Sequence, residues 1–498
     1  MKLSRRHFLA STAAVGVIGA VPPLLQPRPA MATTDPVTTL RIEKRAIEVL
    51  GRAADVFGLV QPDGTHGLFT EAGRRFRVRL ENRVTEKALI HWHGLTPPWQ
   101  QDGVPDLSQP ALPASESYDY DFPLAMAGTN WMHSHHGLQE QRLMAAPLII
   151  RDPAEVKSDV QEVVVLLHDF TFRDPKEILM GLQAGGPGAA HSAPTAAVGH
   201  SSPMPQMDHS SMGHSQPAIT PGHGPAVPRA VHLHDIEYDA FLANDRTLRD
   251  PSIFRVERGA RVRLRLINAA TATHFWVDLD RLEGRLVAVD GVPVEPITGR
   301  QFEFAIAQRL DLLLELPRGD GAWPIFAVRE GDTKRTGFVL ATKNGRVPLI
   351  PVEAPRKADA VGLRLERQLR AASPLSPRPA DRRHTITITE EPGYIWKLNG
   401  TVHGQHIPLT VRAGERVEIT FVDQTSMAHP MHLHGHHFQV VAINSERFAG
   451  AVRDTVLVPA RGNVTIAFEA NNPGKWALHC HHLYHMAGGM MTTVEYQS

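Results

Sequence analysis

Three segments of the chain share one pattern of apolar and polar positions. Each begins with glycine, alternates charged and apolar residues, and ends with Asn or Asp nine positions later; the segments are 73–82, 259–268 and 414–423. Alternation with a period of two is typical of a half-buried strand that starts from a turn. We therefore expect three related β units, each containing one such strand.

The units differ in the residues that follow this strand. Nine residues after the strand, the first and third units have His91 (HWHG) and His432 (HLHG), whereas the middle unit has Val277. A second His-x-His pair follows in the outer units at 133–135 and 479–481. Side chains at i and i+2 of a strand point the same way, so each pair presents two imidazoles on one face. The outer two units are predicted to hold metal between them.

The whole chain is predicted to be all-β, with three β-sandwich domains. Short strands separated by Gly/Pro turns, with little helical periodicity, favour this fold. One helix is expected near 175–182. The expected domains are 33–155, 156–352 and 384–498, with a polar linker at 353–383. The second domain includes an insert at 184–228, rich in His and Met, whose composition predicts disorder.

The N-terminal residues 1–32 are predicted to be a twin-arginine signal peptide. Arg5 and Arg6 precede an apolar run and a small-residue cleavage site at 30–32. The signal implies recognition by the Tat export machinery and a periplasmic protein exported with its cofactor. No later segment is long enough to span a membrane. Without the four basic residues of the signal, 48 basic residues face 52 acidic ones. This balance does not favour a nucleic-acid partner.

Cys480 is the only cysteine of the chain, which rules out a disulfide framework. It lies between His479 and His481, with His485 and Met490 close behind. A thiolate, imidazoles and a distant thioether form the trigonal copper site used for electron transfer. In an extended strand, the two flanking histidines point away from the cysteine. The tract is therefore predicted to serve two metal sites joined through covalent bonds.

Four motifs together resemble those of the multicopper oxidases, the laccase and copper-resistance oxidase family. In order they are HWHG (91–94), HSH (133–135), HPMHLHG (429–435) and HCHHLYHMAGGM (479–490). The tail and the His/Met insert are most similar to bacterial periplasmic proteins of the CopA and CumA type. The resemblance implies three cupredoxin-like Greek-key domains, with metal sites in domain 3 and at the interface of domains 1 and 3.

The resemblance also implies four copper ions and a ligand set for each. The type 1 copper would be held by His429, Cys480 and His485, with Met490 axial. The type 2 copper would take His91 and His432, and the type 3 pair would take two sets, His93, His133 and His481, and His135, His434 and His479. The repeat supports this division, because Ala88 stands where the third unit has His429.

The chemistry implied by the family is the reduction of O2 to water with four electrons. Electrons from a donor would pass from the type 1 copper through Cys480 to His479 and His481. Asp102 resembles a family acid that relays protons; the alternative is an aspartate that shapes a turn before glycine. A second acid of several relatives is replaced here by Met486, which puts that relay in doubt.

Several other histidines are predicted not to bind copper as primary ligands, namely His136, His436, His437 and His482. His168 and Asp169 open the middle domain and could form a structural or supporting hydrogen bond, but the sequence does not define their role. The methionines and histidines of the insert suit labile copper; the alternative is a solvated loop without a task.

Three hypotheses for the function follow. The first is a multicopper oxidase that acts in copper tolerance, with Cu(I) or phenolic and aromatic compounds as the donor. The second is an oxidase for Mn(II) or Fe(II), which needs carboxylates such as Glu446 or Asp454 near the type 1 histidines. The third is a protein that sequesters copper without catalysis. A copper-free scaffold of the same fold is excluded, because all the ligands are present.

Overall fold

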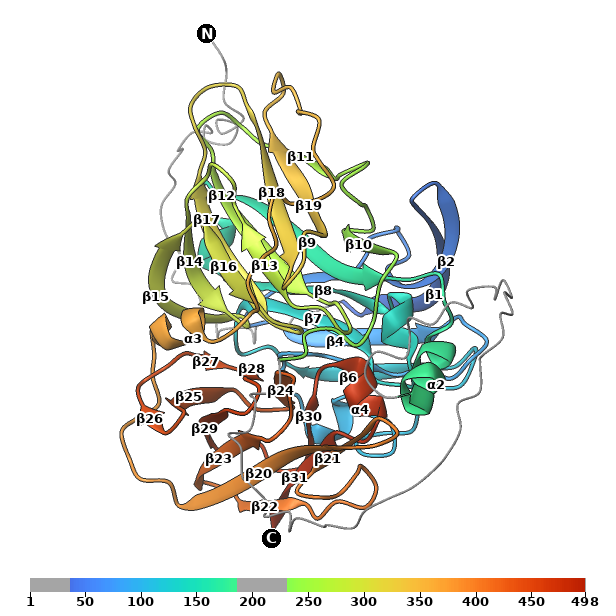
Figure 1. Cartoon of the computed structure of the whole chain (residues 1–498), viewed down its shortest axis with the longest axis vertical. Helices are drawn as coiled ribbons and strands as arrows, with labels where there is room; N and C mark the ends of the chain where they lie inside the picture. Colours follow the sequence, from blue (N-terminus) through green and yellow to red (C-terminus); the bar gives the residue numbers. More distant parts are fainter. Residues whose placement is uncertain (1–35, 186–230, 498) are drawn as a thin grey trace, which may run out of the picture. The chain divides into compact units, whose positions relative to one another are not determined.

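The computed structural model describes residues 36–185 and 231–497. The predicted signal peptide and almost all of the predicted insert lie outside these residues. From Val37 onward the chain forms one compact unit, in which six sheets pair into three successive sandwiches (Figure 1). The prediction of an all-β chain with three sandwiches is confirmed. No helix within the described ranges is long and apolar enough to cross a membrane.

The first sandwich consists of the sheets β2-β1-β4-β6 and β3-β8-β7-β5. Its elements are β1 (Thr38–Val49), β2 (Arg52–Val60), β3 (Leu68–Glu71), β4 (Arg75–Asn82), β5 (Ile90–His91), η1 (Trp99–Gln101), β6 (Ser117–Pro123), β7 (Gly128–Ser134), η2 (Gln139–Arg142) and β8 (Ala145–Arg151). A short helix, α1 (Pro153–Val156), leads into the second sandwich.

The second sandwich consists of the sheets β10-β9-β12-β17-β14-β15 and β11-β19-β18-β13-β16. Its elements are β9 (Gln161–Phe170), α2 (Pro175–Gly185), β10 (Ala240–Ala243), β11 (Ile253–Arg255), β12 (Arg261–Asn268), β13 (Phe275–Asp278), β14 (Gly284–Val289), β15 (Val292–Gly299), β16 (Gln301–Phe304), β17 (Arg309–Glu315), β18 (Ala322–Arg329) and β19 (Arg335–Ala341).

The third sandwich consists of the sheet β21-β20-β23-β29-β25-β26, with β27 on β25, and the sheet β22-β31-β30-β24-β28. Its strands are β20 (Arg382–Glu391), β21 (Ile395–Leu398), β22 (Leu409–Arg412), β23 (Arg416–Asp423), β24 (His429–Leu433), β25 (Phe438–Ile443), β26 (Glu446–Arg447), β27 (Val452–Arg453), β28 (Thr455–Val458), β29 (Asn463–Glu469), β30 (Lys475–Cys480) and β31 (Met491–Gln497). Helix α4 (Leu483–Ala487) lies between β30 and β31.

The three segments with the shared pattern form β4, β12 and β23, at the same place in each sandwich. Each pairs in parallel with the first strand of its unit, which is β1, β9 or β20. In β4 the side chains of Phe76, Val78 and Leu80 are buried, and the residues between them are exposed or half-buried. The period of two therefore puts one face of the strand into the core, as predicted.

Helix formation also follows the prediction. The helix expected near 175–182 is α2, in which Ile178 and Leu182 are buried. These residues are four apart and share one face of the helix. The segment expected to be a linker contains a further short helix, α3 (Arg364–Gln368), whose Glu366 is buried.

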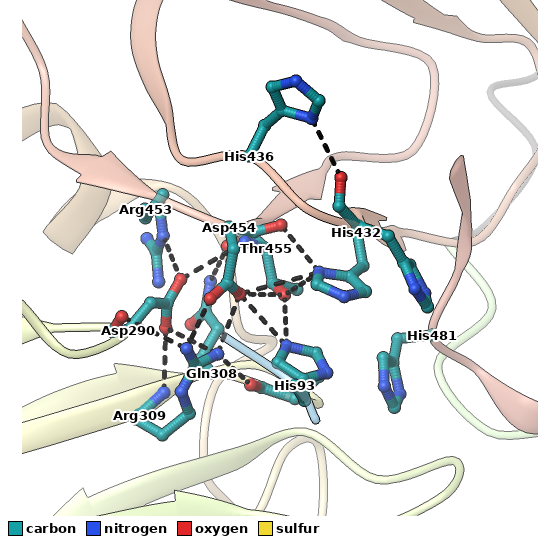
Figure 2. A network of polar contacts seen from close by, with 12 residues as sticks. His93, Asp290, Gln308, Arg309, His432, His436, Arg453, Asp454, Thr455 and His481 are labelled. Atoms are coloured by element: carbon teal, nitrogen blue, oxygen red, sulfur yellow. Dashed lines mark hydrogen bonds and ion pairs between the residues drawn. The ribbon is translucent and has the colours of Figure 1, made fainter. Parts of the chain in front are cut away.

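Arg309 joins all three sandwiches through buried hydrogen bonds (Figure 2). It lies in β17 of the second sandwich, where its Nε donates to the backbone oxygen of Thr129 in the first sandwich (3.1 Å). Its two terminal nitrogens donate to the carboxylate of Asp454 in the third sandwich, Nη1 at 2.8 Å. Next to this pair, Arg453 donates to Asp290 Oδ2 (2.8 Å). A buried ion pair is tolerated only where hydrogen bonds satisfy both partners, and the pair of Arg309 and Asp454 meets that condition.

Replacing Arg309 is expected to weaken the whole assembly. In Arg309→Met, Asp454 keeps its charge in a buried place without its guanidinium, which costs about 3–5 kcal/mol of unfolding free energy. Urea unfolding of the copper-free protein measures the loss. The matched control is Arg79→Met, which breaks the exposed ion pair with Asp119 and should leave the free energy of unfolding nearly unchanged, because solvent screens the pair. Equal losses in the two variants would contradict the proposed importance of the buried pair.

Candidate metal centres

Strand pairing places the two histidine pairs of each outer sandwich opposite one another. His91 on β5 faces His133 on β7 in the antiparallel register. His432 on β24 faces His479 on β30 in the same way. The chain then turns after each first pair through a glycine with positive φ, Gly94 (95°) or Gly435 (66°), a conformation that glycine adopts without strain. The repeat therefore builds the same four-histidine arrangement twice.

The eight imidazoles come together between the first and third sandwiches. The rings of His93 and His432 stack at 3.8 Å between centroids, and those of His91 and His434 lie 3.8 Å apart. Seven of the eight side chains are buried and His135 is half-buried. Three sets of ring nitrogens lie close together: His91 Nε2 and His432 Nε2 (3.5 Å), His133 Nε2 and His481 Nε2 (3.3 Å), and His479 Nε2 with both His434 Nε2 (2.9 Å) and His135 Nε2 (3.3 Å).

Hydrogen bonds on the outer side of the rings decide which nitrogen is left for a metal. His91 Nδ1 donates to the backbone oxygen of Asp102 and His432 Nδ1 to that of Asp454, each at 2.9 Å, so their Nε2 atoms face inward. His93 is reversed: its Nε2 lies 3.0 Å from Asp454 Oδ1, and its Nδ1 makes no hydrogen bond within the described residues. This anchoring is what metal-binding histidines require to hold one tautomer.

The charge state of the cluster also fits a metal. Burial is the main cause that lowers the pKa of His93, His135, His432, His434 and His481 well below the usual value for histidine. A neutral imidazole has a free lone pair and is the form that binds metal. Groups of these histidines have their ring nitrogens within 4.8 Å of one another. The residues present therefore fit copper ions.

A second cluster surrounds Cys480. Its Sγ lies 3.8 Å from both His429 Nδ1 and His485 Nδ1, and these two nitrogens are 3.2 Å apart. Ligands bound at about 2.0–2.3 Å around one transition-metal ion are separated by about this much. Met490 is fully buried, and its backbone oxygen accepts a hydrogen bond from Cys480 N (3.1 Å). The donor set matches the thiolate, imidazole and thioether chemistry of a type 1 copper.

Burial raises the pKa of the Cys480 thiol. A buried thiolate therefore depends on a nearby positive charge, because burial disfavours the charged form. A metal ion bound between the two Nδ1 atoms would supply that charge, since coordination deprotonates a thiol. The cluster fits a bound metal better than a free cysteine.

Two polar side chains fix the type 1 histidines from behind. His429 Nε2 lies 2.8 Å from Thr425 Oγ1, and His485 Nε2 lies 2.9 Å from Asp235 Oδ2. Tyr394 also donates to this carboxylate. Burial alone would raise the pKa of Asp235, but the imidazoles of His232 and His485 outweigh it and hold the pKa well below the usual value. Sequence reasoning missed Asp235, which lies shortly after the insert and in no recognisable motif.

Asp102 is buried against the eight-histidine cluster. Its Oδ2 lies 2.7 Å from His434 Nδ1, and its Oδ1 lies 3.2 Å from His91 Nδ1. The carboxylate thus touches ligand candidates from both outer sandwiches. This contact supports the view that Asp102 acts at the cluster, in addition to ending the helical turn η1.

Glu140 is a second buried acid at the cluster, and no motif in the sequence points to it. It lies in η2, where Oε2 is 3.1 Å from His133 Nδ1 and Oε1 is 3.9 Å from His481 Nδ1. The side chain is 2% exposed. The histidines that it contacts, His133 and His481, differ from those that Asp102 contacts.

The other residues that the sequence analysis considered lie elsewhere or have other partners. Asp454 lies at the eight-histidine cluster rather than beside the type 1 histidines, and Glu446 is exposed and pairs with Arg367. His436 Nε2 is bonded to the Tyr496 hydroxyl. His168 and Asp169, whose role the sequence left open, make structural hydrogen bonds: His168 Nδ1 bonds to Ala269 O, and the Asp169 carboxylate accepts from residues 271–273.

Comparisons with known proteins agree on one family. Three family models described as multicopper oxidase match residues 67–155, 161–345 and 376–498. The multicopper oxidase MmcO of Mycobacterium tuberculosis is 28% identical, with 85% of this chain and 80% of that protein covered. Copper resistance protein A of Escherichia coli is 26% identical, with 85% and 86% covered. A Neurospora crassa laccase is 25% identical, with 80% and 67% covered.

Solved structures show the same fold. The multicopper oxidase of Pseudomonas thermotolerans aligns with a TM-score of 0.67 and 23% identity, over 93% of this chain and 99% of that one. Fet3p, described as a multicopper oxidase that functions in iron import, aligns with a TM-score of 0.73 and 17% identity, over 93% and 90%. These likenesses confirm the cupredoxin-like, all-β architecture. The chain belongs to the multicopper oxidase family and is an oxidase that uses oxygen.

Proposed function

We propose that the protein couples the one-electron oxidation of a donor at one copper to the four-electron reduction of O2 to water at a cluster of three. The observation that carries the proposal is the pair of donor sets that meet at residues 479–481. Cys480 belongs to the trigonal set with His429 and His485. Its two chain neighbours, His479 and His481, belong to the eight-histidine set. The two sets are therefore linked by a few covalent bonds.

The ligand assignment follows the resemblance to the family, and it is supported by the close nitrogens of His91 and His432, of His133 and His481, and of His479 with His135 and His434. We assign His429, Cys480, His485 and an axial Met490 to a type 1 copper, and His91 and His432 to a type 2 copper. One type 3 copper takes His93, His133 and His481, and the other takes His135, His434 and His479. The bound copper ions would supply the transfer and storage of single electrons. The protein's part is to present neutral imidazoles with fixed tautomers and to keep the cluster away from bulk water.

Reduction of O2 to water also consumes protons, and two acids are placed to hold them. Asp102 Oδ2 lies against His434 and Glu140 Oε2 against His133. Because a carboxylate within hydrogen-bond reach of the reacting region can pass a proton, we assign Asp102 this role. Glu140 supports the orientation of His133, because its Oε2 lies 3.1 Å from the same Nδ1 that bonds to the Ser134 backbone oxygen (3.1 Å), and both contacts leave Nε2 free for the metal.

The donor is proposed to be Cu(I) or a phenolic or aromatic compound, with a role in copper tolerance in the periplasm. The names of the relatives support this choice, because they include copper resistance proteins and laccases. An alternative is the oxidation of Mn(II) or Fe(II), which the likeness to Fet3p and to a Campylobacter jejuni metallo-oxidase supports. The alternative that is not an enzyme is a protein that sequesters copper without catalysis.

Oxygen uptake by the copper-loaded protein separates the oxidase from the sequestering protein. Cys480→Ser should abolish uptake with every donor and remove the blue absorption of the copper–thiolate bond, because the trigonal set loses its soft ligand. The histidines of the other set stay in place, so copper analysis should show the loss of one ion only. A wild-type protein that binds four copper ions and consumes no O2 with any donor would contradict the proposed oxidase function.

Removal of Glu140 should weaken copper binding at the eight-histidine cluster. Glu140→Ala takes away one of the two oxygens at His133 Nδ1, the other being the backbone oxygen of Ser134, and loss of such a supporting contact costs about 10–100-fold in metal affinity or activity. Copper titration of the apoprotein measures the affinity. Glu140→Gln retains an acceptor oxygen and should restore most of the binding. The exposed Glu116→Ala serves as the control; a Glu140→Ala protein with the same affinity as this control would contradict the assigned role.

The insert between 184 and 228 is proposed to bind labile copper, on the strength of its His and Met residues alone. Deleting residues 190–225 should lower the rate of Cu(I) oxidation and leave the oxidation of a bulky phenol unharmed or faster. Steady-state oxygen uptake with the two donors makes the comparison. Equal loss with both donors would argue against a role specific to copper.

A further inference from the structure

The four His-x-His pairs differ in the residue that stands between the two histidines. It is Ser134 or Leu433 in two of the pairs, and Trp92 or Cys480 in the other two. Serine and leucine side chains do not give up an electron readily, whereas a thiolate and an indole do. Cys480 is the proposed point at which electrons enter the eight-histidine cluster. Trp92 holds the same covalent position in the first sandwich, with a histidine of the cluster on each side.

Trp92 begins a row of contacting aromatic rings that leads towards the surface. Its buried ring lies edge-on to that of Tyr120, with 4.8 Å between centroids and an interplanar angle of 83°. The Tyr120 ring in turn lies 4.8 Å from that of Tyr118, two residues earlier on β6. Aromatic rings at such distances are in direct contact. Since Tyr120 is buried and Tyr118 is half-buried, the row runs outward from the cluster.

The surroundings of the three rings favour a radical on the outermost one. Trp92 Nε1 makes no hydrogen bond within residues 36–185 and 231–497. An oxidised indole without a proton acceptor keeps its proton, and so it can take an electron from a phenol. Gln109 Nε2 donates to the Tyr120 hydroxyl oxygen (3.1 Å), and burial raises the pKa of Tyr120, so this phenol also keeps its proton. Tyr118 is nearest to solvent, which can accept the proton that a neutral tyrosyl radical must lose.

A second indole, Trp131, contacts the cluster without joining a row of this kind. Its ring lies 4.4 Å from that of His133 at an interplanar angle of 22°. Its other aromatic contacts in the described part of the chain are with His93 and His481. All its aromatic neighbours there are thus histidines of the cluster, so Trp131 is the natural comparison for Trp92.

We propose that Trp92, Tyr120 and Tyr118 supply one electron to the eight-histidine cluster when the donor has delivered only three. The inference rests on the proposed oxidase function and adds a protective reaction to it. Trp92 gives up the electron, Tyr120 restores Trp92, and Tyr118 restores Tyr120 and releases its hydroxyl proton to solvent. In sum, one O2, three electrons from the donor, three protons and the Tyr118 phenol give two waters and a Tyr118 radical. A later molecule of the reducing donor returns the radical to tyrosine with one electron, and solvent returns the proton.

The first experiment deprives the cluster of its fourth electron. Cys480→Ser removes the type 1 site, so the fully reduced, copper-loaded protein stores three electrons. This protein is mixed with O2 and frozen within the first turnover, and its electron paramagnetic resonance spectrum is recorded. We expect the signal of a tyrosyl radical, which should become narrower in protein grown on ring-deuterated tyrosine.

Further substitutions in the Cys480→Ser protein identify the route. Tyr118→Phe and Trp92→Phe each keep an aromatic ring in place but interrupt the row, so each should lose most of the tyrosyl signal. Tyr496→Phe is the matched control, because this half-buried tyrosine stacks on His436, outside the row, and its loss should leave the signal unchanged. Copper analysis checks that every variant still binds three ions.

The second experiment measures damage in the protein that retains Cys480. Wild type, Tyr118→Phe and Tyr496→Phe turn over with scarce donor and excess O2, and peptide mass spectrometry counts the oxygen atoms added to the histidines of the cluster. After equal O2 consumption, Tyr118→Phe should carry more added oxygen than the other two proteins. Equal damage in all three would contradict a protective role.

The outcomes distinguish this inference from the proposed function. If the wild type reduces O2 and the Cys480→Ser protein gives no tyrosyl signal, or gives one that survives Tyr118→Phe, the row is wrong and the oxidase function stands. A signal that persists in Trp92→Phe and disappears in Trp131→Phe would overturn the assignment to Trp92. If the wild type consumes no O2 with any donor, the proposed function and the electron supply by the row are both overturned.

Discussion

The buried guanidinium of Arg309 is the contact on which the rest of the structure depends. It comes from the middle sandwich, which has no histidine pair, and bonds to Thr129 O of the first sandwich and to Asp454 of the third. The eight-histidine cluster exists only when the first and third sandwiches face one another. The middle sandwich therefore contributes to the metal site without supplying a ligand, because it fixes the two that do.

The hydrogen bonds of Arg309 also extend, through Asp454, to the eight-histidine cluster. Asp454, which accepts two hydrogen bonds from Arg309, presents Oδ1 to His93 and its backbone oxygen to His432 (Figure 2). One residue thereby orients a ring from each outer sandwich. A hydrogen bond to one imidazole nitrogen fixes the tautomer and leaves the other nitrogen for the metal. Asp454 therefore both joins the sandwiches, through Arg309, and sets the tautomers of His93 and His432.

The sequence predicted those features that depend on local periodicity. Strands β4, β12 and β23 follow from alternation, and the His-x-His pairs follow from the rule that i and i+2 share a face. Asp235 and Arg309 escaped prediction because each acts through contacts distant in the chain: Asp235 and His485 are 250 residues apart. Glu140 and Arg309 resemble ordinary surface charges in the sequence, and only the packing of three sandwiches buries them.

Four buried acids at or next to the histidine cluster divide into two kinds by what balances their charge. Asp454 and Asp290 are paired with Arg309 and Arg453, so they are stable without metal. Asp102 and Glu140 face imidazoles instead. Copper ions bound to the same rings would bring positive charge next to these two acids and would favour their burial. The first kind holds the sandwiches together, and the second ties the stability of the cluster to the ions that it binds.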